Sequence, residues 1–288
     1  MIEAGHLRIG ELSRRTGVSP ELLRAWERRY SLLKPTRSTG GLRLYTSDDV
    51  ERVTRMQQHL ADGLAAAEAA ALASARPADM DGLAFDAAAV RHDLGAALES
   101  FDDAYAQAVL DSVLSMTTLD TVLAEVVLPY LHELGERWER GEVSVAQEHF
   151  ASAVLRGRLL GLARGWSRGF GPRVLLACLP GEQHDLGLIA FGLALRARGW
   201  RIAYLGGDMP IESVVSAAQA VDPVFVVLSA VDAERVRRST AELKSLARAQ
   251  RICLGGAGAG EAEANAIGAT LLVGGPVEEA QRLTELAS

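Results

Sequence analysis

A histidine flanked by carboxylates is the most chemically suggestive group in this 288-residue sequence. Residues 180–187 read P-G-E-Q-H-D-L-G and follow an apolar run, residues 173–179, that predicts a β-strand. A loop imidazole can bind a metal through one ring nitrogen while a neighbouring carboxylate holds the other. His184 is therefore a candidate metal ligand, and Glu182 and Asp185 are candidates for orienting it. A loop histidine without a ligand is the plainer alternative.

Two other predicted strands also end in small or polar residues. Ser229-Ala230-Val231 closes the apolar run 224–229, and Gly255-Gly256 follows the run 252–254. Ligands of parallel sheets bind beyond the carboxyl ends of the strands, so these loops belong to the same search as the His184 loop. The glycines follow the fourth predicted strand instead of the first, which argues against a dinucleotide phosphate fingerprint.

The elements that must position these loops alternate regularly from residue 172 onward. Apolar runs at 173–179, 201–205, 224–229, 252–254 and 270–273 are each followed by an amphipathic stretch. Five βα units of this kind predict an α/β doubly wound parallel sheet.

Four apolar-periodic stretches of helical length precede the sheet, at residues 86–100, 102–116, 119–140 and 144–166. They predict a four-helix bundle, and Ser144 with Gln147 forms a capping-box pattern at the start of the last helix. Trp138 near the end of the third helix and Glu148-His149 on the fourth stand out. Taken alone, they would most often be a core residue and a polar surface.

The first 60 residues outline a winged helix-turn-helix. Two short amphipathic stretches are joined by the turn Gly17-Val18-Ser19-Pro20. Ser19 suits an N-cap and Pro20 suits the first helical position. The double glycine Gly40-Gly41 lies between short extended pieces and predicts a hairpin wing. Trp26 fits the small core at least as well as a DNA contact.

Charge is distributed unevenly along the chain. Residues 1–60 hold eleven basic and seven acidic side chains, a net charge of +4, whereas the rest of the chain carries −11 of the total of −7. A basic N-terminal module joined to an acidic remainder of the chain indicates that the module binds the phosphates of a nucleic acid. The alternative is that these arginines form an ordinary solvated surface. The Pro/Gly stretch Arg76–Gly82 predicts a hinge. We expect a DNA-binding domain at 1–75, a linker at 76–84, the bundle at 85–168 and the α/β domain at 171–288.

The composition, 49% hydrophobic, predicts a globular protein. Its apolar runs are far shorter than the roughly 20 residues that a membrane-spanning helix needs, and the N-terminus lacks the apolar segment of a signal peptide. We therefore expect a cytoplasmic protein that does not contact a membrane. Cys178 and Cys253 each lie in an apolar run, which predicts buried reduced thiols instead of a disulfide or metal pair.

Four short motifs lie between residues 7 and 72: Val18-Ser19-Pro20, Leu23-Arg24, Glu27-Arg28-Arg29-Tyr30 and Arg43-Leu44-Tyr45. Together they resemble the MerR family of winged-helix regulators. The resemblance implies that the second helix enters the major groove of double-stranded operator DNA and that the wing grips the flanking backbone. The implied DNA-binding residues are Ser19, Arg24, Arg28, Arg29, Tyr30, Arg37, Arg43 and Tyr45.

The loop residues of the sheet domain also resemble a known family. E-x-H-x-x-G at 182–187, Ser229-Ala230-Val231 and Gly255-Gly256 are similar to the cobalamin-binding domain family, which usually has leucine in place of Val231. The resemblance implies that His184 replaces the cofactor's own base as the lower axial ligand of cobalt, and that Glu182 and Ser229 orient it. Gly187, Gly255 and Gly256 would then leave room for the corrin and its nucleotide tail.

The spacing W-x9-E-H, from Trp138 to His149, resembles cobalamin-dependent photoreceptor repressors of the CarH and LitR type. The resemblance implies adenosylcobalamin, or methylcobalamin, with Trp138, Glu148 and His149 around the upper axial group. It also implies a homo-oligomer, up to a tetramer, that binds operator DNA in the dark and comes apart when light breaks the cobalt–carbon bond. Glu139 departs from this pattern, because the best-understood members have a histidine there that binds cobalt after illumination.

Two other functions stay open at this point. A light-independent regulator could sense cobalamin through occupancy alone. A corrinoid methyl-transfer carrier has a similar pair of domains, but the DNA-binding module argues against it, and the sequence predicts no separate catalytic site.

Overall fold

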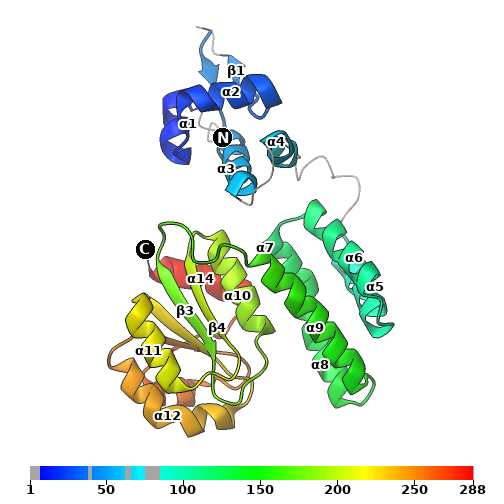
Figure 1. Cartoon of the computed structure of the whole chain (residues 1–288), viewed down its shortest axis with the longest axis vertical. Coiled ribbons are helices and arrows are strands. Elements are labelled where there is room, and N and C mark those ends of the chain that lie inside the picture. The colour runs from blue at the N-terminus through cyan, green and yellow to red at the C-terminus, as the bar shows by residue number, and fades with distance from the viewer. Residues whose placement is uncertain (1–6, 38–40, 62–65, 75–84, 288) are drawn as a thin grey trace, which may run out of the picture. The chain divides into compact units, whose positions relative to one another are not determined.

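The computed structural model describes residues 7–37, 41–61, 66–74 and 85–287. The chain forms two compact units, Met1–Ala84 and Phe85–Ser288 (Figure 1). The wing residue Gly40 and the expected linker 76–84 lie outside the described residues.

The first unit is a winged helix-turn-helix, as the sequence predicts. Its elements are α1 (Ile9–Thr16), α2 (Pro20–Tyr30), β1 (Thr36–Arg37), β2 (Arg43–Leu44), α3 (Ser47–Ala61) and α4 (Ala66–Ser74). The turn forms because Gly17 adopts φ +70° after α1, and the Ser19 hydroxyl accepts the Leu22 N–H at 3.3 Å to begin α2. Strands β1 and β2 pair antiparallel as the wing. Trp26 is 6% exposed, so it belongs to the core of this unit.

The second unit begins with a helical bundle. It consists of α5 (Ala87–Glu99), α6 (Asp103–Met116), a third helix that runs through α7 (Leu119–Thr121), η2 (Val122–Val127) and α8 (Leu128–Glu139), and α9 (Val145–Leu162). The four-helix prediction is confirmed, although α9 ends four residues before the expected Trp166. The predicted capping box is present, with Ser144 and Gln147 bonded reciprocally.

The third helix of the bundle contains an irregularity that periodicity did not predict. Residues 122–127 form a π-helix, in which the Leu128 N–H bonds to the carbonyl of Leu123. Pro129 has no N–H for the carbonyl of Glu125, four residues before it, and Arg91 from α5 donates to that oxygen at 2.6 Å. The irregular turn is thereby satisfied from a neighbouring helix.

Five parallel strands follow: β3 (Arg173–Cys178), β4 (Arg201–Gly206), β5 (Phe225–Ser229), β6 (Ile252–Gly255) and β7 (Thr270–Leu271), in the order β4-β3-β5-β6-β7. The connecting and final helices are α10 (Leu186–Ala197), α11 (Ile211–Val221), α12 (Ala233–Ala247), α13 (Glu261–Ile267) and α14 (Pro276–Leu286). Strand β4 pairs with one side of β3, whereas β5 and the later strands lie on its other side. Doubly wound sheets bind ligands at such a switch point, here between β3 and β5. Register places Cys178 beside Ser229 and Ser229 beside Gly255, so these strands end at one edge.

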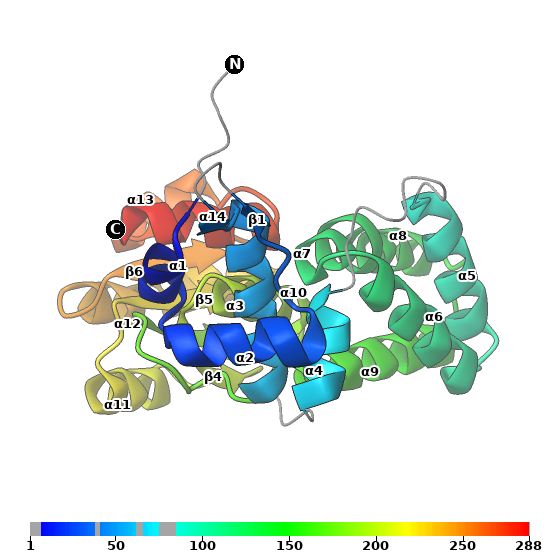
Figure 2. The ribbon, with the colours of Figure 1, turned by 90° about the horizontal axis from the view of Figure 1, so that it is seen from above.

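One apolar core joins the bundle to the sheet. It runs from the bundle helices through α10 and α14 to one face of the sheet, while a second core lies under α11 and α12. Helix α9 packs on α10, and α5 and α6 lie on the side of the bundle away from the sheet (Figures 1 and 2). Within the described ranges, no helix is long and apolar enough to cross a membrane.

Candidate functional site

The histidine loop follows β3 and is held by the carboxylate of Glu182. This side chain is fully buried and accepts the backbone N–H groups of Val231 at 2.7 Å and of His184 at 3.0 Å, and a guanidinium N–H of Arg235 at 2.5 Å. Nδ1 of His184 lies 2.5 Å from the same carboxylate. The predicted Glu182–His184 pair therefore exists in the structure, and a residue that the sequence analysis missed, Arg235 on α12, supports it.

The protonation of this pair follows from its surroundings. Burial alone raises the pKa of Glu182, but the hydrogen bonds from Val231, His184 and Arg235 outweigh it and lower the pKa to about 2. An ionised carboxylate only accepts hydrogen bonds, so Nδ1 of His184 carries the proton. The His184 side chain is 69% exposed, so its second ring nitrogen, Nε2, is accessible to a metal.

Asp185 has different partners from those the sequence suggested. Its carboxylate, 4% exposed, forms a two-pronged ion pair with Arg156 of α9, at 2.8 to 3.1 Å, and accepts the Tyr204 hydroxyl at 2.5 Å. Burial and then the bond to Asp185 raise the pKa of Tyr204, so its hydroxyl keeps the proton that it donates. Asp185 thus joins the histidine loop to the helical bundle, and Glu182 alone takes the orienting position beside His184.

A cavity of about 420 Å³ opens beside the strand ends. Its lining includes all three predicted glycines, Gly187, Gly255 and Gly256, together with Ser229. Gly256 has φ +93°, and a Cβ there would collide with the carbonyl oxygen of Ala230, so a side chain at this position would distort the turn. Ser229 faces this cavity, while the oxygens of Glu182 are occupied by other donors, so the expected support of His184 by Ser229 is not the arrangement observed.

The corner between α8 and α9 carries the three bundle residues of the predicted site. Trp138 is 47% exposed, and the His149 side chain is 75% exposed. The Glu148 carboxylate lies 2.7 Å from Nδ1 of His149 and accepts a hydrogen bond from the hydroxyl of Ser152 at 2.7 Å. Nearly half of a tryptophan side chain is thus left open to a further contact.

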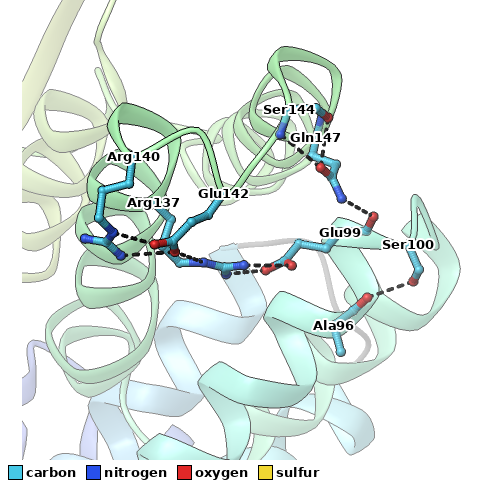
Figure 3. A network of polar contacts seen from close by, with 8 residues as sticks. All are labelled: Ala96, Glu99, Ser100, Arg137, Arg140, Glu142, Ser144 and Gln147. Atoms are coloured by element: carbon cyan, nitrogen blue, oxygen red, sulfur yellow. Dashed lines mark hydrogen bonds and ion pairs between the residues drawn. The ribbon is translucent and has the colours of Figure 1, made fainter.

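Polar contacts fix this corner to the end of α5 (Figure 3). Arg137 donates to both carboxylate oxygens of Glu99, at 2.6 and 3.1 Å. Gln147, already part of the capping box with Ser144, donates to the backbone carbonyl of Glu99 at 3.0 Å. A bidentate arginine pair holds its partners in a defined geometry, so the residue next to Arg137, Trp138, lies on a rigid support.

Most of the predicted DNA-binding residues of the first unit lie on its surface. Ser19, Arg24, Arg28, Arg29 and Arg43 are exposed and Tyr30 is partly exposed. Arg29 stacks over the Tyr30 ring, 5.6 Å from its centroid. The side chain of Arg37 lies outside the described part of the structure.

Tyr45 is placed differently from the expectation of a DNA contact. It is fully buried, and its hydroxyl donates to Glu27 at 3.0 Å. Burial, and then the bond to Glu27, raise its pKa to about 12. Glu27 also binds Arg43 at 2.9 Å, so Tyr45 anchors the wing to α2 from within the core instead of reaching DNA itself.

Comparison with known proteins follows the same division of the chain. Residues 7–76 match the model of the MerR HTH family regulatory protein, and residues 90–160 and 172–284 match two models described as a B12 binding domain. The HTH-type transcriptional repressor CarH of Myxococcus xanthus is 36% identical over 269 residues, covering 88% of this chain and 89% of the relative. The HTH-type transcriptional repressor CarA of the same organism is 34% identical over 261 residues, with 88% of each chain covered.

The chain belongs to the CarH-type family of cobalamin-binding MerR regulators.

Family membership decides between the open function classes. The CarH-type relatives are named transcriptional repressors, so this chain is a regulator and not an enzyme, and the carrier alternative is set aside. The structure of the monomethylamine corrinoid protein of Methanosarcina barkeri shares the fold of the second unit. It aligns with a TM-score of 0.58 at 18% identity, covering 70% of this chain and all of that protein. This likeness concerns the fold alone.

Two partners of Asp185 could not be predicted from the sequence around the histidine motif. Arg156 lies on α9, 29 residues before Asp185, and Tyr204 lies in β4, 19 residues after it. An arginine in an amphipathic helix and a tyrosine in a strand are ordinary residues there. Only the packing of the bundle against the sheet reveals their shared partner.

Proposed function

We propose that this chain represses transcription by binding operator DNA when adenosylcobalamin is bound to its second unit. The observation that carries the proposal is the Glu182–His184 pair beside a glycine-lined cavity, in a chain that also contains a winged helix-turn-helix. The repressors CarH and CarA support the assignment through their similarity along most of the chain.

The described residues fit a corrin cofactor. A metal held by the four nitrogens of a corrin ring needs only an axial ligand from the protein, and His184 offers an accessible Nε2. The cavity lined by Gly187, Gly255 and Gly256 suits the nucleotide tail, because a side chain at Gly256 would meet the backbone of Ala230. Val273 lines this cavity and is 78% exposed, an apolar surface that a large ring can cover.

Each side chain of the proposed site has one task. His184 would hold the cobalt of a bound cobalamin through Nε2, and Glu182 would orient its ring through Nδ1. Trp138, Glu148 and His149 would contact the group that cobalamin carries on its other face, with Trp138 offering apolar surface to it. When bound, adenosylcobalamin supplies a cobalt–carbon bond that light breaks.

We propose light as the signal, with release of DNA following loss of the upper group. Loss of that group removes the apolar partner of Trp138, and close-packed helices respond to such a loss by shifting as units. Glu139, at the end of α8, takes the position where the family pattern has a second histidine, so the residue after Trp138 offers a carboxylate instead of an imidazole. A light-independent cobalamin sensor is the second candidate, and Glu139 is the observation that favours it.

On the DNA side, we propose that α2 enters the major groove and that the wing holds the backbone. The exposed arginines Arg24, Arg28 and Arg29 contact phosphates or base edges, while Glu27 fixes Arg43 against α2. Two copies of this unit would read two half-sites, which requires the chain to assemble at least as a dimer.

Size-exclusion chromatography with light scattering and absorbance detection tests the proposal on the full chain. The protein is loaded with adenosylcobalamin in the dark and measured before and after illumination, alone and with a duplex that it has selected from a random pool. We expect a red, larger, DNA-binding species in the dark and a smaller species that releases DNA in light. Cobalamin binding without any response to light would favour the sensor, and absence of binding would contradict the cofactor assignment.

A further inference from the structure

The His184 loop is held at two points that belong to different parts of the second unit. On one side, Glu182 is bonded to Val231 and Arg235, which belong to the sheet domain. On the other side, the residue directly after His184, Asp185, is bonded to Arg156 of the bundle helix α9. One peptide unit separates Asp185 from His184, so a shift of Asp185 moves the histidine with it.

We infer that Arg156 is a positioning residue that couples the cobalt ligand His184 to helix α9, so that the helical bundle detects whether His184 has bound the cofactor. The inference rests on the proposed function, because it assigns a regulatory contact to the same site. It adds a route from the histidine loop to the bundle through the Asp185–Arg156 ion pair.

The geometry and burial of the contact favour a defined, switch-like link. Arg156 presents Nε and a terminal nitrogen to Asp185 at distances between 2.8 and 3.1 Å, a bidentate pair that tolerates little displacement. Asp185 is 4% exposed, whereas the Arg156 side chain is 48% exposed. If α9 moves away, Arg156 exchanges its partner for water, but the buried carboxylate keeps only the Tyr204 hydroxyl. The closed arrangement is therefore strongly preferred over a partly opened one.

Tyr204 ties the same carboxylate to the sheet and to the end of the bundle. Its hydroxyl donates to Asp185 at 2.5 Å, and its ring packs edge-on against Trp166, with centroids 5.5 Å apart. Trp166 follows α9 in the chain and is 8% exposed. Asp185 is thus the point where α9, β4 and the histidine loop meet.

A second ion pair between the bundle and the sheet domain supplies the comparison. Arg198, at the C-terminal end of α10, binds Asp120 of α7 at 2.8 Å. Asp185 precedes the first residue of α10, so the two ion pairs lie at opposite ends of this helix. Both join the bundle to the sheet domain, but only the Arg156 pair involves the histidine loop.

Hydrogen–deuterium exchange of the full chain, with and without adenosylcobalamin in the dark, tests the inference. The variants are Arg156→Met, its conservative form Arg156→Lys, and Arg198→Met as the matched control. In the wild type, loading should slow exchange in the histidine loop and in α9. In Arg156→Met the loop should respond and the protein should keep the absorbance spectrum of histidine-bound cobalamin, but the response of α9 should fall by about 5-fold or more. Arg156→Lys should restore part of it, and Arg198→Met should behave as the wild type.

An α9 response in Arg156→Met equal to that of the wild type would overturn the inference, as would an equal loss in Arg198→Met. Unloaded protein gives a separate reading, since Arg156→Met should exchange faster than Arg198→Met in residues 180–186. Failure of the wild type to bind cobalamin would contradict the proposed function, and the unloaded variants would still decide whether Arg156 holds the loop. If Arg156→Met does not fold, Arg156→Lys, which cannot form the two-pronged pair with Asp185, should still speed exchange of residues 180–186 relative to Arg198→Met, and an unchanged rate would count against the link.

Discussion

Replacing Glu182 with glutamine tests whether a buried carboxylate fixes the His184 loop before any cofactor binds. Glu182 is fully buried, and its oxygens accept hydrogen bonds from Val231, His184 and Arg235. Burial works against its ionised form, yet these bonds lower its pKa from 4.5 to about 2. Glutamine has nearly the same shape but no charge, so Glu182→Gln removes mainly the electrostatic part of the contact.

The size of the effect follows from the pKa. A pKa shift of one unit corresponds to about 1.4 kcal/mol. The native surroundings therefore favour the ionised over the neutral carboxyl of Glu182 by about 3 kcal/mol. This is an upper value for Glu182→Gln, because the amide oxygen still accepts hydrogen bonds. With a urea dependence of about 2 to 3 kcal/mol per M, the unfolding midpoint of the second unit should fall by up to about 1 M.

The pH dependence of this difference has a definite sign. A lowered native pKa stabilises the protein above the unfolded value of about 4.5, and that contribution disappears as the pH falls towards about 2. The gap between wild type and Glu182→Gln should therefore be full at pH 7 and should close between pH 4.5 and 2.

Urea unfolding of the cobalamin-free full chain, followed by tryptophan fluorescence and circular dichroism, measures this gap. Glu242→Gln, at an exposed position on α12, is the control and should leave the midpoint unchanged. Equal midpoints for wild type and Glu182→Gln at pH 7, or a gap as large at pH 3 as at pH 7, would refute the reasoning.

Substitutions and labelling at other positions test three further parts of the structure. Gly256→Ala, at φ +93° and against the Ala230 carbonyl, should lower the free energy of unfolding by about 1 to 3 kcal/mol and weaken cobalamin binding. Gly157→Ala, on α9 with nothing within 4 Å of the added methyl, should raise that free energy by about 1 kcal/mol, and effects of the same sign on urea unfolding would contradict one of the two. Burial raises the pKa of Cys178 and of Cys253 to about 12, so neither thiol should react with a disulfide reagent at pH 8 until the protein is unfolded, and fast labelling of native protein would be inconsistent with this. Arg29→Ala should reduce the slope of log affinity for DNA against log salt concentration by about 1, and an unchanged slope would exclude a phosphate contact.

Regular patterns made most of the fold predictable. Alternating apolar runs and amphipathic stretches indicated five parallel strands, and the helical periods indicated the bundle, because both follow from local side-chain spacing. The strand order β4-β3-β5-β6-β7 depends on which strands pair, which local spacing does not encode. The π-helix at 122–127 was also missed, since its cause is one missing N–H at Pro129 and a donor, Arg91, from another helix.

The site was predictable where its residues are close in sequence. Glu182 and His184 belong to one loop, so their contact followed from the motif. Asp185 was expected beside the histidine, but it pairs with Arg156, because an unpaired buried carboxylate is costly and the nearest cation lies on α9. Tyr45 was expected on the DNA, but its ring fills the core of the first unit. Both differences come from tertiary packing, which the motifs do not describe.

The absorbance spectrum of the full chain with adenosylcobalamin in the dark tests most directly whether His184 binds cobalt. The wild type should show the spectrum of histidine-ligated cobalamin, His184→Ala should lose it, and His132→Ala, at an exposed histidine paired with Glu136, should keep it. An identical spectrum in wild type and His184→Ala would contradict the assignment of His184 as the axial ligand.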